Sequence, residues 1–100
     1  MNKLFGTGSS VNFGDLRRAG AVILDVRSPG EFIAGHIKGA LNINVENLEN
    51  RLQDLPDHDK VIITCCASGG RSARAYSLLK SKGYVNVHDG GGWYILNQKL

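Results

Sequence analysis

Two nearly continuous runs of hydrophobic residues predict buried β-strands. The first run, residues 21–26, reads Ala-Val-Ile-Leu-Asp-Val, and the second, residues 61–65, reads Val-Ile-Ile-Thr-Cys. Because neither run alternates between apolar and polar positions, we expect each strand to be covered on both faces. The tripeptide Ser-Pro-Gly at residues 28–30 breaks the first run. Two shorter strands are expected near residues 40–43 and 85–88.

Segments with helical spacing of apolar residues separate these strands. A short helix is predicted over residues 13–19, after the capping residue Asn12 and before a glycine. Residues 45–55 place their valine and three leucines on one helical face, and residues 71–82 place an alanine and two leucines on another. One or two helical turns are expected to close the chain over residues 93–100.

This order of elements predicts an α/β fold in three layers, with a parallel sheet covered by helices on both faces. A chain of 100 residues suffices for about one small domain. We therefore expect a single domain over residues 1–100, with its core over about residues 12–95. In open parallel sheets, ligands bind beyond the carboxyl ends of the strands, so that edge is where a site is expected.

Composition and charge exclude several classes of protein. Hydrophobic residues make up 42% of the chain and charged residues 21%, which is ordinary for a globular domain. The longest apolar runs are only a few residues long, so no membrane span is expected. A net charge of +3 is too small to indicate nucleic-acid binding. The N-terminus lacks the apolar core of a secretion signal, and cysteines without a distant partner fit a reducing compartment, so a cytoplasmic protein is expected.

The cations are unevenly distributed along the chain. Residues 60–88 contain five of them and no Asp or Glu. These five are Lys60, Arg71, Arg74, Lys80 and Lys82. The surface formed by this stretch is therefore expected to attract anions.

A cysteine-containing loop carries the most specific chemical signal. Cys66 stands at the carboxyl end of the second apolar run, and small residues separate it from Arg71, which opens a predicted helix. A helix N-terminus and a nearby arginine favour the thiolate. Small residues allow successive backbone N–H groups to converge on an anion. We expect Cys66 to be a nucleophile at the floor of an anion cradle, with Arg71 as its clamp.

The neighbouring Cys65 is expected to have a different role. It continues the strand, and consecutive side chains of a strand point to opposite faces. Cys65 should therefore point away from the loop and into the packing, while Cys66 faces the loop.

Four segments together resemble the signatures of rhodanese domains. Residues 25–32 and 35–43 resemble the first signature of that family. Residues 66–72, with the sequence Cys-Ala-Ser-Gly-Gly-Arg-Ser, resemble its active-site loop, and residues 90–93 resemble its C-terminal signature. The resemblance runs over about residues 12–93, which is nearly the whole chain.

The resemblance implies a rhodanese-like fold with a five-stranded parallel sheet, and it implies sulfurtransferase chemistry. Cys66 would take a sulfane sulfur from a small anionic donor, thiosulfate or another persulfide donor, and become a persulfide. It would then pass the sulfur to a thiol, to cyanide or to a protein sulfur acceptor. No metal or organic cofactor is implied. The donor would be bound by the loop residues Ala67, Ser68, Gly69, Gly70, Arg71 and Ser72.

Four polar residues of the first signature are interpreted as structural: Asp25, Arg27, Glu31 and His36. Arg27 and Glu31 are spaced to pair across a turn, and Asp25 is placed to anchor neighbouring backbone. Trp93 is interpreted as a core residue beneath the last helical turn.

Two other functions remain as alternatives. Counted from Cys65, the loop fits Cys-x5-Arg71, which is the pattern of cysteine phosphatases, including those that share the rhodanese fold. Counted from Cys66, it is the shorter Cys-x4-Arg pattern of sulfurtransferases. A non-catalytic binding or regulatory module is the second alternative, although inactive rhodanese domains typically lack the cysteine or the arginine, and this chain has both.

Overall fold

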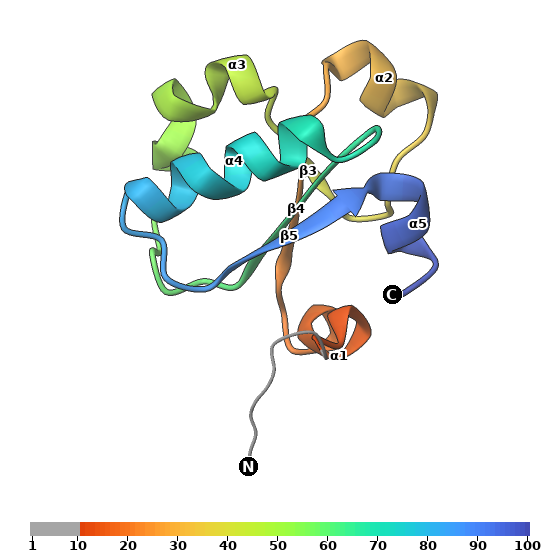
Figure 1. Ribbon diagram of the computed structural model, residues 1–100, viewed down its shortest axis with the longest axis horizontal. Coiled ribbons are helices and arrows are strands. Elements are labelled where there is room, and N and C mark those ends of the chain that lie inside the picture. The colour runs from red at the N-terminus through yellow and green to blue at the C-terminus, as the bar shows by residue number, and fades with distance from the viewer. Residues whose placement is uncertain (1–10) are drawn as a thin grey trace.

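Four parallel strands form the sheet of the computed structural model, which describes residues 11–100 (Figure 1). They are β2 (Val22–Asp25), β3 (Leu41–Asn42), β4 (Ile62–Cys66) and β5 (Val87–Gly92). Their order in the sheet is β3-β2-β4-β5, and each neighbouring pair is parallel.

The α/β class and the parallel sheet are confirmed, but the expected five strands are not found among residues 11–100. The sheet they form has four strands. Each of these four contains residues of a run that the hydrophobic pattern predicted. The fifth strand was implied by the family resemblance alone, and the further apolar run at residues 93–96 forms a helix, Trp93–Asn97, rather than a strand.

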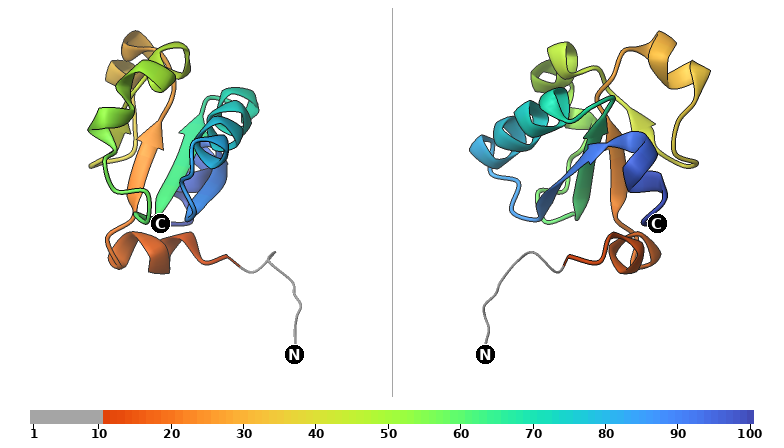
Figure 2. Two further views of the ribbon diagram at one scale, coloured as in Figure 1. Left: turned by 90° about the vertical axis from the view of Figure 1, so that its left-hand side faces the viewer. Right: turned by 45° about the vertical axis from the view of Figure 1, so that its right-hand side comes forward.

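Six helical segments accompany the sheet. They are α1 (Phe13–Arg18), α2 (Pro29–Ala34), α3 (Val45–Leu48), the 3-10 helix η2 (Glu49–Asp54), α4 (Gly70–Ser81) and α5 (Trp93–Asn97). Figure 2 shows α2 and α3 at the end of the sheet where the strands finish, whereas α1 lies at the opposite end. None of the helices in residues 11–100 has the length and apolar character needed to cross a membrane.

Two hydrophobic clusters confirm the three-layer arrangement. One face of the sheet contributes Leu24 and Ile62, which pack with residues of α3 and α4 such as Leu48 and Leu79. The other face contributes Ile23 and Ile63 of the same strands, with which Phe13 of α1 and Leu96 of α5 pack. Both strands are thus buried on both faces, as their lack of polar alternation predicted.

The break expected at residues 28–30 is the start of a helix. Ser28 caps α2 by accepting a hydrogen bond from the backbone N–H of Glu31, whose side chain accepts one from the backbone N–H of Ser28. Pro29 occupies the first helical turn, where its missing N–H costs nothing. The strand does end here, but this reciprocal capping box turns the chain into α2.

The helix expected over residues 45–55 divides into two. α3 has four residues, and η2 follows with non-helical backbone angles at Arg51. The predicted apolar face is retained across this kink, because Leu48 and Leu55 are both buried in the same cluster.

The last strand extends further than the pattern predicted. Residues 85–88 were expected, but β5 continues through its three glycines to Gly92. A Cβ on Gly90 would lie 2.6 Å from the carbonyl oxygen of Thr64 and 2.8 Å from Leu96. Only glycine therefore fits where β5 runs closest to β4 and α5.

Candidate active site

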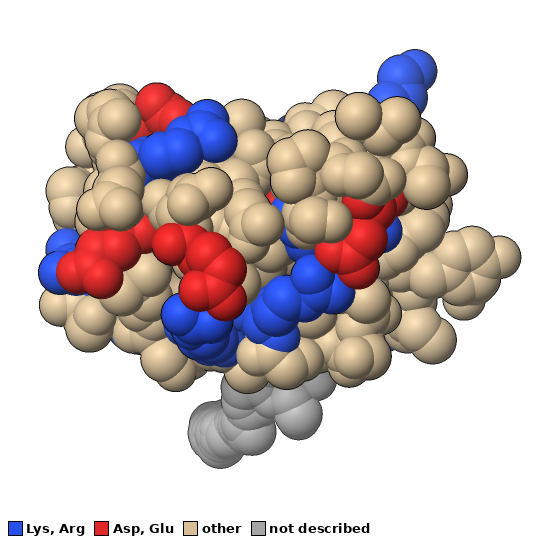
Figure 3. All heavy atoms as spheres, turned by 90° about the horizontal axis from the view of Figure 1, so that it is seen from above, with Lys and Arg blue, Asp and Glu red and all other residues tan. Residues whose placement is uncertain are grey.

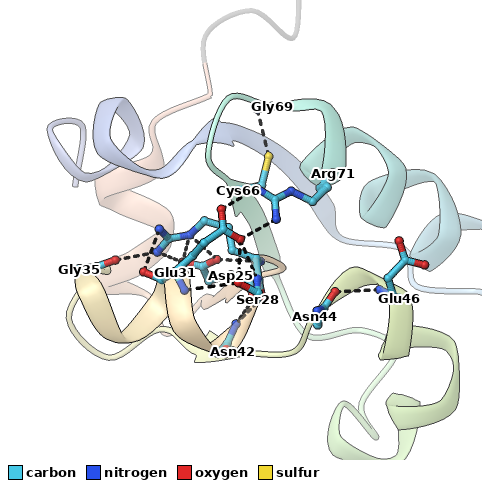
Figure 4. A network of polar contacts seen from close by, with 11 residues as sticks. Asp25, Ser28, Glu31, Gly35, Asn42, Asn44, Glu46, Cys66, Gly69 and Arg71 are labelled. Carbon is cyan, nitrogen blue, oxygen red and sulfur yellow. Dashed lines mark hydrogen bonds and ion pairs between the residues drawn. The ribbon is translucent and has the colours of Figure 1, made fainter.

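The strand β4 places Cys66 at the edge of the sheet where ligands of parallel sheets bind (Figure 4). Its sulfur accepts a hydrogen bond from the backbone N–H of Gly69, with an N–Sγ distance of 3.0 Å. Gly69 is the N-cap of α4 and has a φ of +118°, in the left-handed region that favours glycine. The loop glycine thus turns a helix-capping N–H onto the sulfur, and Cys66 as a whole is 1% exposed.

The rest of the loop lies over the sulfur and reaches the surface. Ala67 and Ser68 are exposed, and Gly70 begins α4. The backbone N–H of Gly69 contacts the Cys66 sulfur. The predicted roles of Ala67, Ser68 and Gly70 in binding the sulfur donor stay predictions. Their exposure leaves them accessible to a small anion.

Cys65 lies on the other face of the sheet, as strand alternation predicted. It is fully buried and belongs to the cluster that contains Ile37, Ile63 and Leu96, whereas Cys66 belongs to the opposite cluster. Burial, and to a lesser degree the nearby carboxylate of Asp25, raises the pKa of the Cys65 thiol to about 12. Cys65 is therefore a protonated packing residue at neutral pH.

Arg71 forms a two-point ion pair with Glu31. Its Nη1 donates to Oε1 at 2.7 Å, and its Nη2 donates to Oε2 at 3.0 Å. The Arg71 bond and the two bonds from Ser28 lower the pKa of Glu31 to about 2, and the same contact raises the pKa of Arg71. The active-site loop is thereby linked to α2, from a residue 40 positions earlier in the chain.

The expected pairing of Arg27 with the carboxylate of Glu31 is wrong. The Arg27 side chain turns inward and binds Asp25 through Nε at 3.0 Å and Nη2 at 2.7 Å. Two further N–H groups, on Nη1 and Nη2, donate to the backbone carbonyls of Glu31 and Gly35, and the guanidinium lies 4.8 Å from the ring centre of Trp93. Asp25 is fully buried, so the nearest cation must compensate its charge, and Arg27 does so.

Asp25 anchors the backbone as predicted. Its Oδ1 accepts the backbone N–H of Arg27 at 3.0 Å. Asn42 of β3 completes this corner by donating to the backbone carbonyls of Asp25 and Arg27, both at 3.0 Å. The end of β2 is thereby fixed below the active-site loop.

Ser72 is buried, and its hydroxyl is engaged by the protein. The hydroxyl donates to Asp89 at 2.6 Å and lies 2.8 Å from the hydroxyl of Thr64. These contacts tie the first turn of α4 to β4 and β5. The predicted role of Ser72 in donor binding stays a prediction. The sequence did not indicate Thr64 and Asp89 as its partners, because no local spacing connects them to the loop.

Residues 60–88 contain no Asp or Glu, but acidic side chains from other segments of the fold contact their cations. Besides Arg71, the cations Arg74 and Lys82 pair with Glu46 and Glu49, both at 2.9 Å. Figure 3 shows basic and acidic side chains in contact on the face above the strand ends. Acids from α2, α3 and η2 thus offset three of the five cations, which weakens the anion attraction expected of this surface.

The His36 side chain contacts its own helical segment. The His36 ring stacks on Phe32, and its Nδ1 lies 2.6 Å from the Phe32 carbonyl oxygen. Within the part of the chain that the structure describes, no three His, Cys, Asp or Glu residues are grouped as metal ligands.

Comparisons with known proteins agree with this geometry. The family model described as rhodanese-like domain matches residues 12–94. Thiosulfate sulfurtransferase GlpE of Pseudomonas fluorescens is 36% identical over 78 residues, which are 76% of this chain and 71% of the relative. Thiosulfate sulfurtransferase PspE of Escherichia coli is 31% identical over 70 residues, or 69% of this chain and 67% of the relative.

A solved structure gives the same assignment. The human single-domain sulfurtransferase superposes with a TM-score of 0.74 at 34% identity, over 83% of this chain and 86% of that one. The family model covers well over half of the chain, and it includes the strand end, the cysteine loop and the glycine-rich strand described above. The chain therefore belongs to the rhodanese-like domain family.

Proposed function

We propose that this protein is a sulfurtransferase whose Cys66 carries the sulfur between donor and acceptor. The observation that carries the proposal is the hydrogen bond from the N-cap amide of α4 to the Cys66 sulfur. A helix N-terminus stabilises negative charge, which both the thiolate and the persulfide carry. The two relatives described above are named thiosulfate sulfurtransferase, which supports the same chemistry for this chain.

The reaction would proceed in two balanced displacements. In the first, the Cys66 thiolate attacks the outer sulfur of thiosulfate, the sulfur–sulfur bond of the donor breaks, and sulfite leaves with the bonding electron pair. Cys66 is then a persulfide anion. In the second, cyanide or a thiolate attacks the terminal sulfur, and the Cys66 thiolate leaves. The Gly69 amide faces the sulfur that regains negative charge at the end of the cycle.

Arg71 would bind the anionic end of the donor. It is the only charged residue between positions 61 and 73, and its side chain is 37% exposed. A guanidinium can hold the oxygens of an anion through paired N–H groups. Arg71 thus gives the site its preference for an anionic sulfur donor.

The two alternative functions fit the geometry less well. A phosphatase that used Cys65 would need its sulfur in the loop, and that sulfur is buried on the opposite face of the sheet. A purely non-catalytic module would not need a cysteine under a helix-capping amide, and this chain retains one.

Intact-protein mass spectrometry after exposure to thiosulfate tests the proposal. The wild type and Cys65→Ser should each gain one sulfur atom, and neither Cys66→Ser nor Cys66→Ala should gain any. Steady-state transfer from thiosulfate to cyanide should follow the same pattern, with circular dichroism confirming that each variant is folded. Sulfur that follows Cys65 instead would refute the proposal and favour the phosphatase alternative.

A further inference from the structure

The carboxylate of Glu31 is held more firmly than an ordinary surface acid. Its Oε1 accepts three hydrogen bonds, from the backbone N–H and the hydroxyl of Ser28, both at 3.0 Å, and from Nη1 of Arg71. Its Oε2 accepts the fourth bond, from Nη2 of Arg71 at 3.0 Å. The capping box of α2 thus fixes the carboxylate, and the carboxylate in turn fixes Arg71 (Figure 4).

This contact determines which N–H groups Arg71 offers to a donor. A guanidinium has five N–H groups, and the pair with Glu31 uses one on each terminal nitrogen. The group on Nε and one on each terminal nitrogen stay available. Arg71 is therefore held in one orientation, while three of its five N–H groups remain free to bind an anion.

The same contact offsets the charge of Arg71. Apart from the reacting sulfur of Cys66, no other formal charge lies between positions 61 and 73, so Glu31 and Arg71 together add almost no net charge to the loop. Both side chains are 37% exposed, so part of their field reaches the solvent above the loop. An anion that approaches Cys66 meets the attraction of Arg71 and the repulsion of Glu31 together.

We infer that Glu31 sets the selectivity of the site between anionic and neutral sulfur donors, by orienting Arg71 and by offsetting its charge. Glu31 is a positioning residue in this role, since it acts on the donor through Arg71. The inference deepens the proposed function and rests on it. Replacing Glu31 with Gln keeps an oxygen that accepts from Arg71 and Ser28, but it removes the negative charge, so reactions with anions should accelerate.

A pair of alkylating reagents tests the inference without any sulfur transfer. Iodoacetate is an anion and iodoacetamide is its neutral analogue of similar size. The rate of Cys66 alkylation by iodoacetate, divided by the rate with iodoacetamide, therefore reports the local electrostatic field. Differences between variants in how accessible Cys66 is affect both rates alike and cancel in this ratio. We expect Glu31→Gln to raise this ratio roughly fivefold at low salt, with a smaller rise at high salt. Peptide mass spectrometry assigns the adduct to Cys66 rather than Cys65.

Glu46 provides the matched control. It pairs with Arg74 of the same helix α4, and its side chain is 67% exposed (Figure 4). Glu46→Gln changes the net charge by the same amount, yet its ratio should stay within about twofold of the wild-type ratio. Salt screening weakens the effect of an exposed charge on a distant site. Glu31→Asp, which keeps the charge, should also leave the ratio near that of the wild type.

The outcomes separate this inference from the proposed function. An unchanged ratio in Glu31→Gln, or an equal rise in Glu46→Gln, would overturn the inference. Glu31→Ala also removes the charge and must raise the ratio, which provides a second test if Glu31→Gln does not fold. A raised ratio in a protein that transfers no sulfur would refute the proposed function alone. In an active protein, kcat/KM for thiosulfate should rise relative to a neutral organic trisulfide, mainly through KM.

Discussion

Cys65 and Cys66 are adjacent in the chain, yet they occupy different chemical environments. The period-two geometry of β4 directs Cys65 into one hydrophobic cluster and Cys66 into the other, at the end of the strand where the loop begins. Only Cys66 has a backbone N–H of the α4 N-cap within hydrogen-bond distance of its sulfur. The proposal of Cys66 as the nucleophile thus rests on the direction of a side chain rather than on residue type.

Substitutions of Cys65 should reveal its role in packing. Cys65→Ser buries a hydroxyl among Ile37, Ile63 and Leu96, and should lower the free energy of unfolding by about 1–3 kcal/mol. Cys65→Ala introduces no polar group and should cost less. Urea unfolding of the three proteins measures the difference. If Ser were tolerated better than Ala, a polar partner for the hydroxyl would have to exist in this cluster.

The helix α2 connects the first signature of the family to the active-site loop. A capping box of Ser28, the residue before the helix, and Glu31 starts its six residues, and the same Glu31 carboxylate reaches Arg71 at the start of α4. The capping box was present in the sequence as Ser-x-x-Glu, but the Pro-Gly dipeptide between these two residues favoured a turn. Proline in the first helical turn is compatible with both structures, and tertiary contacts favoured the helix.

The pH dependence of stability should report the contacts of Glu31. Arg71, and then Ser28, lower the pKa of this carboxyl from 4.5 to about 2. A lowered pKa means that the ionised form stabilises the folded state above about pH 4.5, and that this contribution is lost as the pH falls towards about 2. The difference in unfolding free energy between wild type and Glu31→Gln should therefore shrink across this range.

Urea unfolding of both proteins at several pH values would measure that difference. Glu46→Gln again serves as the control for a carboxylate paired with an arginine of α4, without the contacts to the capping box. If the unfolding free energies of wild type and Glu31→Gln differed by the same amount from neutral to acidic pH, the ion pair would contribute nothing to stability in solution.

At the scale of the whole molecule, β5 brings the sheet and the last helix together. Gly90 lies so close to β4 that a Cβ there would be 2.6 Å from the Thr64 carbonyl oxygen and 2.9 Å from Ile63. Thr64 in turn contacts Ser72 in the first turn of α4. The glycine-rich strand thus sets the spacing on which the position of the active-site loop depends.

Replacing Gly90 with Ala should disturb this packing. The carbonyl that it meets belongs to a central strand and cannot move away cheaply, so we expect a loss of about 1–3 kcal/mol in unfolding free energy. Gly30→Ala is the control, because a Cβ there meets nothing within 4 Å and lies in α2. That variant should be neutral or more stable by about 0.5–1 kcal/mol. Thermal unfolding of both would check this, and equal stability of Gly90→Ala and wild type would contradict the packing argument.

The sequence by itself determined the layers of this protein and indicated which loop we propose to be reactive. Apolar runs predict strands covered on both faces because burial is a property of each residue and its immediate neighbours. For the same reason, the Asn12 cap of α1 and the opposite directions of Cys65 and Cys66 followed from local pattern. The spacing between Cys66 and Arg71 in the loop is also a local feature, so it could be identified from the sequence.

Only the tertiary structure decided how the charged groups pair. Arg27 binds Asp25 rather than the carboxylate of Glu31, and that carboxylate binds Arg71 from 40 residues away. Local spacing permitted the pairing of Arg27 with Glu31, but an ion pair forms where distance and burial allow it. Both are set by how α2 and α4 pack at the end of the sheet, which no local pattern records.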